Sequence, residues 1–143
     1  MFNTHHLHPM TVHFPIAIIM LGFLVDALSM FFNKKEPCLS KFGFWLMILG
    51  TLAAVLGYLT GEFFSENLTG QLGELKETHE LFAKTAMFIM IAASALRIFI
   101  VIKKKETTSL KWIVFCLYFI AVVCIGIAGL LGGNLVYDYM IGL

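Results

Sequence analysis

The chain has 143 residues, of which 59% are hydrophobic and 13% are charged, and its mean hydropathy is +0.89. This composition excludes a water-soluble domain of ordinary make-up, which carries about 25% charged residues, and the net charge of +1 argues against a nucleic-acid partner, which needs clustered basic residues. We therefore expect a membrane protein in which residues 1–143 form one domain of about four spans.

Four apolar segments follow one another along the chain, at residues 10–32, 42–64, 81–102 and 110–131. Each is long enough to cross about 30 Å of hydrocarbon at about 1.5 Å per residue. In the first linker, Pro37 is expected to stop a helix and Ser40 to cap the next one. The cap of the last helix is expected from one of three hydroxyl residues, Thr107, Thr108 or Ser109.

Charge is distributed unevenly between the linkers. Lysines concentrate in the loops 33–41 and 103–111, whereas the longer middle linker, SENLTGQLGELKETHE, is mainly acidic. Because short lysine-rich loops stay in the cytoplasm, these two loops are predicted to be cytoplasmic and both termini to lie outside. The predicted fold is all-α, a four-transmembrane-helix antiparallel up-down bundle.

Four of the five histidines lie in the stretch HHLHPMTVHFP, at the start of the first span. His8 precedes Pro9 and is expected to be extended, because a residue before proline avoids the helical region. His13 is expected just inside the helix, with Pro15 in the first turn, where its missing N–H does no harm. The helix then fixes the direction of the His13 side chain, and His8 can approach this side chain from the loop.

In the third span, His79 and Arg97 are 18 residues apart, which is five turns at about 3.6 residues per turn. They therefore share one helix face. Between them on this face lie small or flexible residues: Ala83, Ala86, Met90 and Ala93. A face bracketed by histidine and arginine is expected to point into the bundle, away from lipid. His79 should lie about one turn below the outer surface.

Two charged residues lie deep in the spans, Asp26 and Arg97. A charge in a span costs at least about 2.5–3.5 kcal/mol, so each of these residues needs a partner or a task. Both lie late in odd-numbered helices that run in the same direction, and they should reach similar depth. We predict an ion pair between them near the cytoplasmic end, with a structural role.

Glycines recur at helical spacing in the second and fourth segments. Gly57 and Gly61 form a GxxxG pair, and Gly129 and Gly133 belong to a glycine-rich stretch of the last segment. Such residues let helices approach closely, or they make room for a flat cofactor. Spacing does not distinguish these two interpretations.

Two imidazoles at equal depth on facing helices of a bundle are suited to axial ligation of a haem. His13 and His79 are therefore the candidate ligands of a haem b, with Tyr137 close to the same cluster. The chain would then be an electron-transfer subunit that exchanges electrons with a quinone or a cytochrome.

Two other functions remain open. His13 and His79 could instead hold a Zn, Cu or Fe ion without redox chemistry, together with His8 and with Glu62 or Glu80. Alternatively, the chain is a structural or accessory subunit of a larger membrane complex or a homo-oligomer, with hydrogen-bonded histidines. The sequence contains no catalytic motif, so a redox carrier is favoured over an enzyme.

Three stretches resemble an integral-membrane family catalogued as domain of unknown function 2231 (DUF2231): HPMTVHFPIAI, the histidine of ETHELFAKTA, and the closing GGNLVYDYMIG. The resemblance implies a four-helix bundle in a bacterial inner membrane. Family members often occur beside, or fused to, cytochrome c or Rieske domains, which implies a tendency towards electron transfer. The positions most similar to the family pattern are His8, Pro9, His13, Pro15, His79, Gly133 and Tyr137, and less distinctively Asp26 and Arg97.

Overall fold

The computed structural model describes residues 7–32, 37–64, 68–104 and 109–141. These residues form four helices: α1 (Leu7–Phe32), α2 (Pro37–Phe64), α3 (Gln71–Ile102) and α4 (Leu110–Ile141). All four are long and apolar enough to cross a membrane. The predicted all-α bundle of four transmembrane helices is thereby confirmed.

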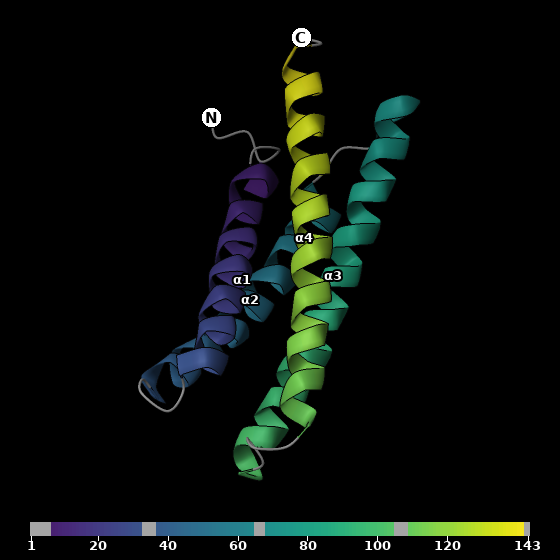
Figure 1. Ribbon diagram of the computed structural model, residues 1–143. Coiled ribbons are helices and arrows are strands. Elements are labelled where there is room, and N and C mark those ends of the chain that lie inside the picture. The colour runs from purple at the N-terminus through teal and green to yellow at the C-terminus, as the bar shows by residue number, and fades with distance from the viewer. Residues whose placement is uncertain (1–6, 33–36, 65–67, 105–108, 142–143) are drawn as a thin grey trace.

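The bundle is built from two helix pairs. α1 packs along α2 and α3 along α4, while smaller contacts between α2 and α3 and between α1 and α4 join the pairs. The start of α1 and the end of α4 lie at the same end of the bundle, where α3 diverges from the other helices (Figure 1). We call this end, which carries His13 and His79, the histidine end; the opposite end, with Lys41, Lys103 and Lys104, is the lysine end.

Two helices extend further than their apolar segments. α3 begins at Gln71 instead of residue 81, and α4 ends at Ile141 instead of residue 131. Hydropathy detects only the part of a helix that suits hydrocarbon, whereas a helix continues into the aqueous phase when local interactions support it. In α3, Lys76 and Glu80 form a pair with a nitrogen–oxygen distance of 3.4 Å one turn apart, and Glu74 lies in the first turn, where the helix dipole favours an acidic residue.

The prolines are placed differently from the prediction. Pro37 is the first residue of α2, a position that needs no N–H donor, and α1 ends before it at Phe32. α1 already begins at Leu7, so that His8 is helical and not extended, and Pro15 lies in the helix interior and not in its first turn. A span tolerates such a proline, since leaving the helical conformation in lipid would expose far more unpaired backbone.

The hydroxyl residues expected as helix caps also differ in their roles. Ser40 lies inside α2 and is buried, so it does not cap the helix. Ser109 directly precedes α4, and its carbonyl oxygen accepts hydrogen bonds from the backbone N–H groups of Trp112 and Ile113. Thr107 and Thr108 lie outside the described residues.

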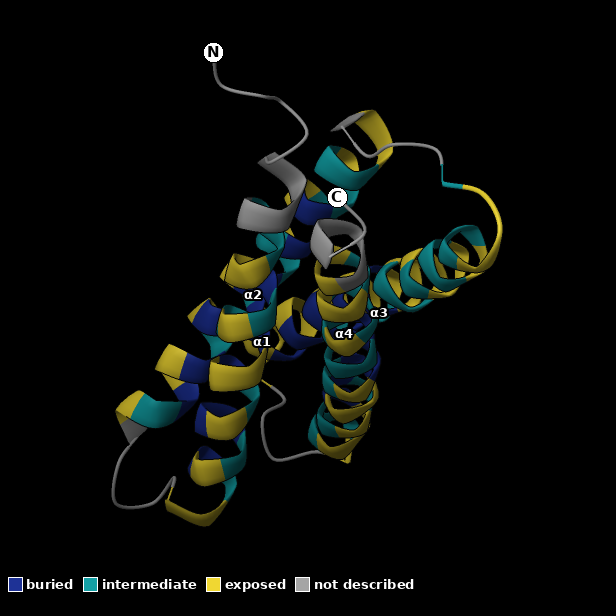
Figure 2. Ribbon diagram, turned by 90° about the horizontal axis from the view of Figure 1, so that it is seen from above, coloured by how far each residue is buried: buried dark blue, intermediate teal, exposed yellow. Residues whose placement is uncertain are grey.

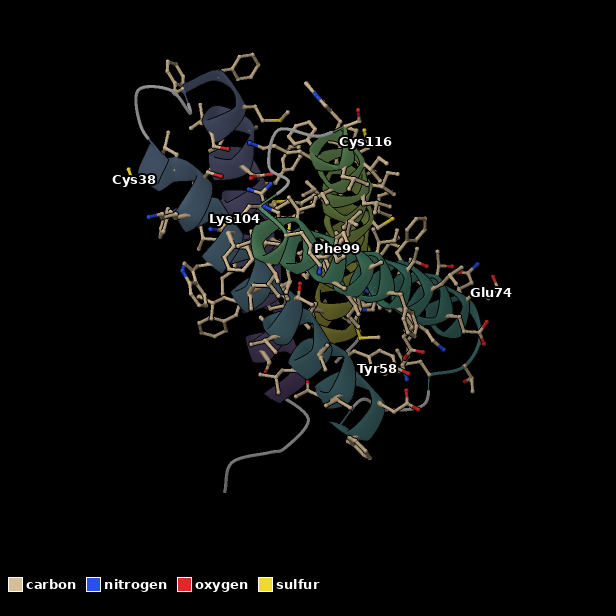
Figure 3. All side chains as sticks on the ribbon, turned by 90° about the horizontal axis from the view of Figure 1, so that it is seen from below. Cys38, Tyr58, Glu74, Phe99, Lys104 and Cys116 are labelled. Carbon is tan, nitrogen blue, oxygen red and sulfur yellow. The ribbon has the colours of Figure 1, made fainter. Side chains whose placement is uncertain are left out.

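The inner faces of the helices form one apolar core, which is coloured dark blue in Figure 2. Its largest fully buried apolar side chains are Ile19, Met47, Met90, Ile100, Val114 and Tyr118. Side chains project outward from the helices, as Phe99 does in Figure 3. The large apolar side chains that are exposed on the outer faces include Leu24, Leu52, Phe88, Ile102 and Leu130. A surface of this kind is suited to lipid, so the chain is a multi-pass protein of a lipid bilayer.

Glycines of α2 bring it into close contact with α1. An added Cβ at Gly43 would lie 3.3 Å from the backbone of Asp26, at Gly50 2.8 Å from Cγ1 of Ile19, and at Gly57 3.5 Å from Cγ of Pro15. These glycines recur every seven residues along one face of α2. They therefore act as close-packing residues, which is one of the two interpretations that the sequence left open.

Gly50→Ala is expected to lower the free energy of unfolding by about 1–3 kcal/mol, because the new methyl group overlaps the fully buried side chain of Ile19. Circular dichroism during denaturant titration in micelles measures this change. Gly126→Ala is the matched control, since its Cβ would make an ordinary 3.5 Å contact with the Cε methyl of Met20. Equal stability of the two variants would contradict the assigned role of Gly50.

Candidate functional site

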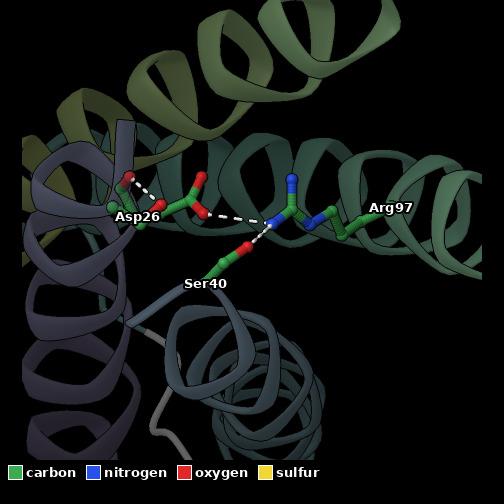
Figure 4. Close-up of polar contacts among 4 residues, drawn as sticks. Asp26, Ser40 and Arg97 are labelled. Atoms are coloured by element: carbon green, nitrogen blue, oxygen red, sulfur yellow. Dashed lines mark hydrogen bonds and ion pairs between the residues drawn. The ribbon is translucent and has the colours of Figure 1, made fainter. Parts of the chain in front are cut away.

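At the lysine end, the structure brings Asp26 of α1 and Arg97 of α3 together. Nη2 of Arg97 lies 3.4 Å from Oδ1 of Asp26, and both residues are 1% exposed (Figure 4). The same nitrogen donates a hydrogen bond of 3.1 Å to Oγ of Ser40 in α2. The hydroxyl of Ser29 donates to the backbone carbonyl of Asp26 at 2.7 Å. One arginine thus joins three helices inside the membrane.

The stripe predicted on α3 faces inward. Ala86, Met90, Ala93 and Arg97 are all buried. Next to this stripe, the hydroxyls of Thr51 in α2 and Ser94 in α3 lie 2.7 Å apart and form a hydrogen bond. Hydrogen bonds of this kind between helices contribute to the packing of transmembrane helices.

At the histidine end, His79 of α3 turns towards α4. Its Nδ1 lies 2.8 Å from the backbone carbonyl oxygen of Ala128. A Cβ at Gly132 of α4 would lie 3.0 Å from Cε1 and 3.2 Å from Nδ1 of His79, so the glycine makes room for the imidazole. The ring is half-buried between the two helices.

His13 lies on α1, on the face that approaches α4. Ile16 and Met20 of this face lie against Gly129 and Gly126 of α4, at 3.1 Å and 3.5 Å from the Cβ positions of the glycines. Because the helices are antiparallel and residues 13, 16 and 20 share one face, the register places His13 level with Gly132 and the residue after it. His13 itself is exposed.

Gly132 of α4 thus lies in contact with His79, and its register on α4 corresponds to that of His13 on α1. The two histidines come from different helices, and the register of α1 against α4 brings His13 to the level of the turn that His79 contacts. A Cβ at Gly133 in this turn would meet no described atom within 4 Å.

The other predicted site residues are spread over several helices or lie outside the described part of the chain. Gly57 and Gly129 are covered by Pro15 and Ile16 of α1, whereas Tyr137 is 67% exposed. Gly61 lies in the last turns of α2, and both candidate glutamates are exposed, with Glu80 paired to Lys76. The side chain of His8 lies outside the described residues, among which no three histidine, cysteine or acidic side chains gather as a metal site.

The sequence profile of the family described as Predicted membrane protein (DUF2231) matches residues 4–143, which is nearly the whole chain. The chain belongs to this family. No curated protein and no solved structure matches it. Membership in DUF2231 agrees with four membrane-spanning helices, and the family description assigns no ligand or reaction.

Sequence reasoning does not find several residues that matter in this DUF2231 protein. Ser40 resembles a helix cap, and Thr51 and Ser94 are single hydroxyls in apolar segments, where a hydroxyl commonly bonds to its own helix. Gly132 cannot be distinguished from the neighbouring glycines by spacing. The usable signal is the intramembrane position of the three hydroxyls, since each must find a partner there.

Proposed function

We propose that this protein binds haem b at the histidine end, with His13 and His79 as axial ligands, and that it transfers electrons in a bacterial inner membrane. The observation that carries the proposal is the 2.8 Å contact between Nδ1 of His79 and the carbonyl oxygen of Ala128. The family resemblance points to the same two histidines.

The contact with Ala128 determines the tautomer of His79. A carbonyl oxygen only accepts hydrogen bonds, so Nδ1 must be the donor and carry a proton. In the neutral ring, Nε2 then holds the lone pair that a metal ligand requires. Metal-bound histidines commonly have this arrangement, in which the second nitrogen donates to a carbonyl group that fixes the ring orientation.

His13 is suited to be the second ligand by its register and exposure. Its register on α1 corresponds to the same turn of α4, and its side chain is exposed. The divergence of α3 from α1 and α2 at this end separates the two histidine-bearing helices (Figure 2). A planar macrocycle between two imidazoles needs such a separation.

The glycine turn supports the fit of a flat group. Gly133 is exposed, and an added Cβ there would meet no described atom within 4 Å, so this part of α4 offers an open surface against which a macrocycle could lie. Gly57 and Gly129 do not contribute such space, because α1 side chains already cover them. Tyr137, one turn beyond Gly133, is exposed and is suited to donate a hydrogen bond to a polar edge of the ligand.

Haem in this place would supply one-electron chemistry, and the protein residues would hold and orient it. If His13 and His79 both bound the iron, they would leave no position open for a small molecule, which would favour electron transfer. A quinone in the bilayer or a cytochrome at the outer surface is the proposed electron partner.

The absorption spectrum of the protein, purified in detergent from haem-replete cells, tests this proposal. We expect a Soret band, sharpened visible bands after reduction, and about one haem per chain. A protein without pigment that co-purifies with a stoichiometric membrane partner would contradict it and favour the accessory-subunit function. Stoichiometric Zn, Cu or Fe in the absence of haem would favour the metal-ion module.

A further inference from the structure

The lysine half of the bundle contains buried polar atoms that the ion pair does not use. Nε and Nη1 of Arg97 and the hydroxyl of Tyr118 are buried, and no described residue gives them a hydrogen-bond partner. Arg97 is 1% exposed and Tyr118 is 0% exposed. Native proteins rarely leave such groups unpaired in the interior, so each of them is expected to bind a hydrogen-bond partner.

These atoms approach two consecutive turns of α1, Tyr118 at Gly22 and Arg97 at Asp26. Asp26, Ser40 and Arg97 come from α1, α2 and α3, and Tyr118 comes from α4. The hydroxyl of Tyr118 lies against Gly22 of α1, where an added Cβ would overlap it. Gly22 is one turn before Asp26 on the same face of α1, so this hydroxyl points towards the part of α1 that carries the carboxylate.

The chemistry of the site identifies the partner as a small neutral molecule. Arg97 already has Asp26 as its counter-ion, so a second anion would leave a net negative charge in hydrocarbon. The unpaired groups are two guanidinium nitrogens, which together carry three N–H donors, and a hydroxyl; the N–H groups need oxygen acceptors. The Arg97–Asp26 distance of 3.4 Å also exceeds the roughly 2.7–2.9 Å of a tight charge-assisted bond.

We infer that this site binds ordered water, which accepts hydrogen bonds from Nε and Nη1 of Arg97 and pairs with the hydroxyl of Tyr118. A water molecule is small enough for a bundle interior and combines donor and acceptor capacity. The inference is independent of the haem proposal, because it concerns the opposite end of the bundle. The inferred water makes this a hydrated polar site inside the bundle, towards the lysine end.

Arg97 is the only arginine in the sequence, which makes the test selective. Uniformly ¹⁵N-labelled protein in phospholipid bilayers gives one set of guanidinium signals in solid-state NMR, and transfer of magnetisation from water protons to these nitrogens reports contact with water. We expect the initial transfer rate to Nε and Nη of Arg97 to be several-fold higher than that to the amide of Ala93. Ala93 lies one turn earlier on α3 and is 0% exposed, so it is the internal dry reference.

Two further measurements complete the test. Tyr118→Phe removes one of the water partners and is expected to slow the transfer to Arg97, while Phe119→Leu, a lipid-facing change at a residue that is 52% exposed, should not. Transfer to Arg97 as slow as that to Ala93 in the wild-type protein would overturn the inference. Dephasing of the Arg97 nitrogens by lipid ³¹P would overturn it as well, because the partner would then be a phosphate group.

Discussion

Replacing Arg97 with methionine is expected to lower the free energy of unfolding by about 3–5 kcal/mol, because the Asp26 carboxylate then stays buried without a counter-charge. Both residues are 1% exposed, so neither charge can reach water without movement of the helices. The variant also removes the donor to Ser40 and with it one of the polar links between α3 and α2. Unfolding in micelles by a denaturing detergent, followed by circular dichroism, measures the loss.

Two variants separate the loss of the ion pair from a general effect of substitution. Ile98→Met changes the neighbouring residue, which is 39% exposed on the lipid side, and should alter stability little. The double variant Asp26→Leu/Arg97→Met removes both charges and is expected to recover much of the stability, since an apolar pair needs no desolvation. Wild-type stability in Arg97→Met or in Asp26→Asn would show that the contact contributes nothing.

His79→Ala is expected to reduce the haem content of the purified protein by at least about tenfold, since loss of even an outer-shell partner of a metal site costs about 10–100-fold in affinity. The substitution removes the imidazole that the Ala128 carbonyl orients against α4. His13→Ala should have a comparable effect through the second axial position. Haem per chain, determined from the spectrum of the pyridine complex, is the measurement.

The neighbouring residues provide matched controls for both histidines. Thr78 is exposed and bonds only within its own helix, to the carbonyl of Glu74, so Thr78→Ala should retain the haem. Phe14 is 66% exposed and directly follows His13, and Phe14→Ala should also retain it. Haem content that is unchanged in His79→Ala but lost in Thr78→Ala would contradict the assignment.

The part of the fold that sequence could predict is the part that lipid dictates. Four apolar segments must become helices, because no other open structure satisfies its backbone in hydrocarbon. Likewise, Asp26 and Arg97 are the two charges deep in the spans. Their similar depth on helices that run in the same direction predicts an ion pair between them. The structure has both the four helices and the contact.

Features that depend on the aqueous ends of the helices or on detailed side-chain packing were harder to predict from the sequence. The early start of α3 depends on Glu74 and on the Lys76–Glu80 pair, in a stretch that looks like a loop on a hydropathy scale. Pro15 in the interior of α1 contradicts the local preference of proline, and the membrane environment overrides that preference. Local patterns also cannot tell which glycines meet a neighbouring helix.

In the candidate site, too, some features could be predicted from the sequence and others could not. The inward direction of the His79 face could be predicted from the periodicity of α3, because its buried residues lie at helical spacing from His79 to Arg97. The acceptor at Ala128 and the space provided by Gly132 could not, since both depend on how α4 is rotated against α3. A carbonyl acceptor carries no sequence signal at all.

The electron paramagnetic resonance spectrum of the oxidised, haem-replete protein tests the central claim most directly, since it reports the axial ligands of the iron. We predict a low-spin ferric signal typical of two imidazole ligands, which is lost in both His13→Ala and His79→Ala. A protein without a haem signal, or a high-spin signal that is unaffected by these substitutions, would contradict a haem held between α1 and α3.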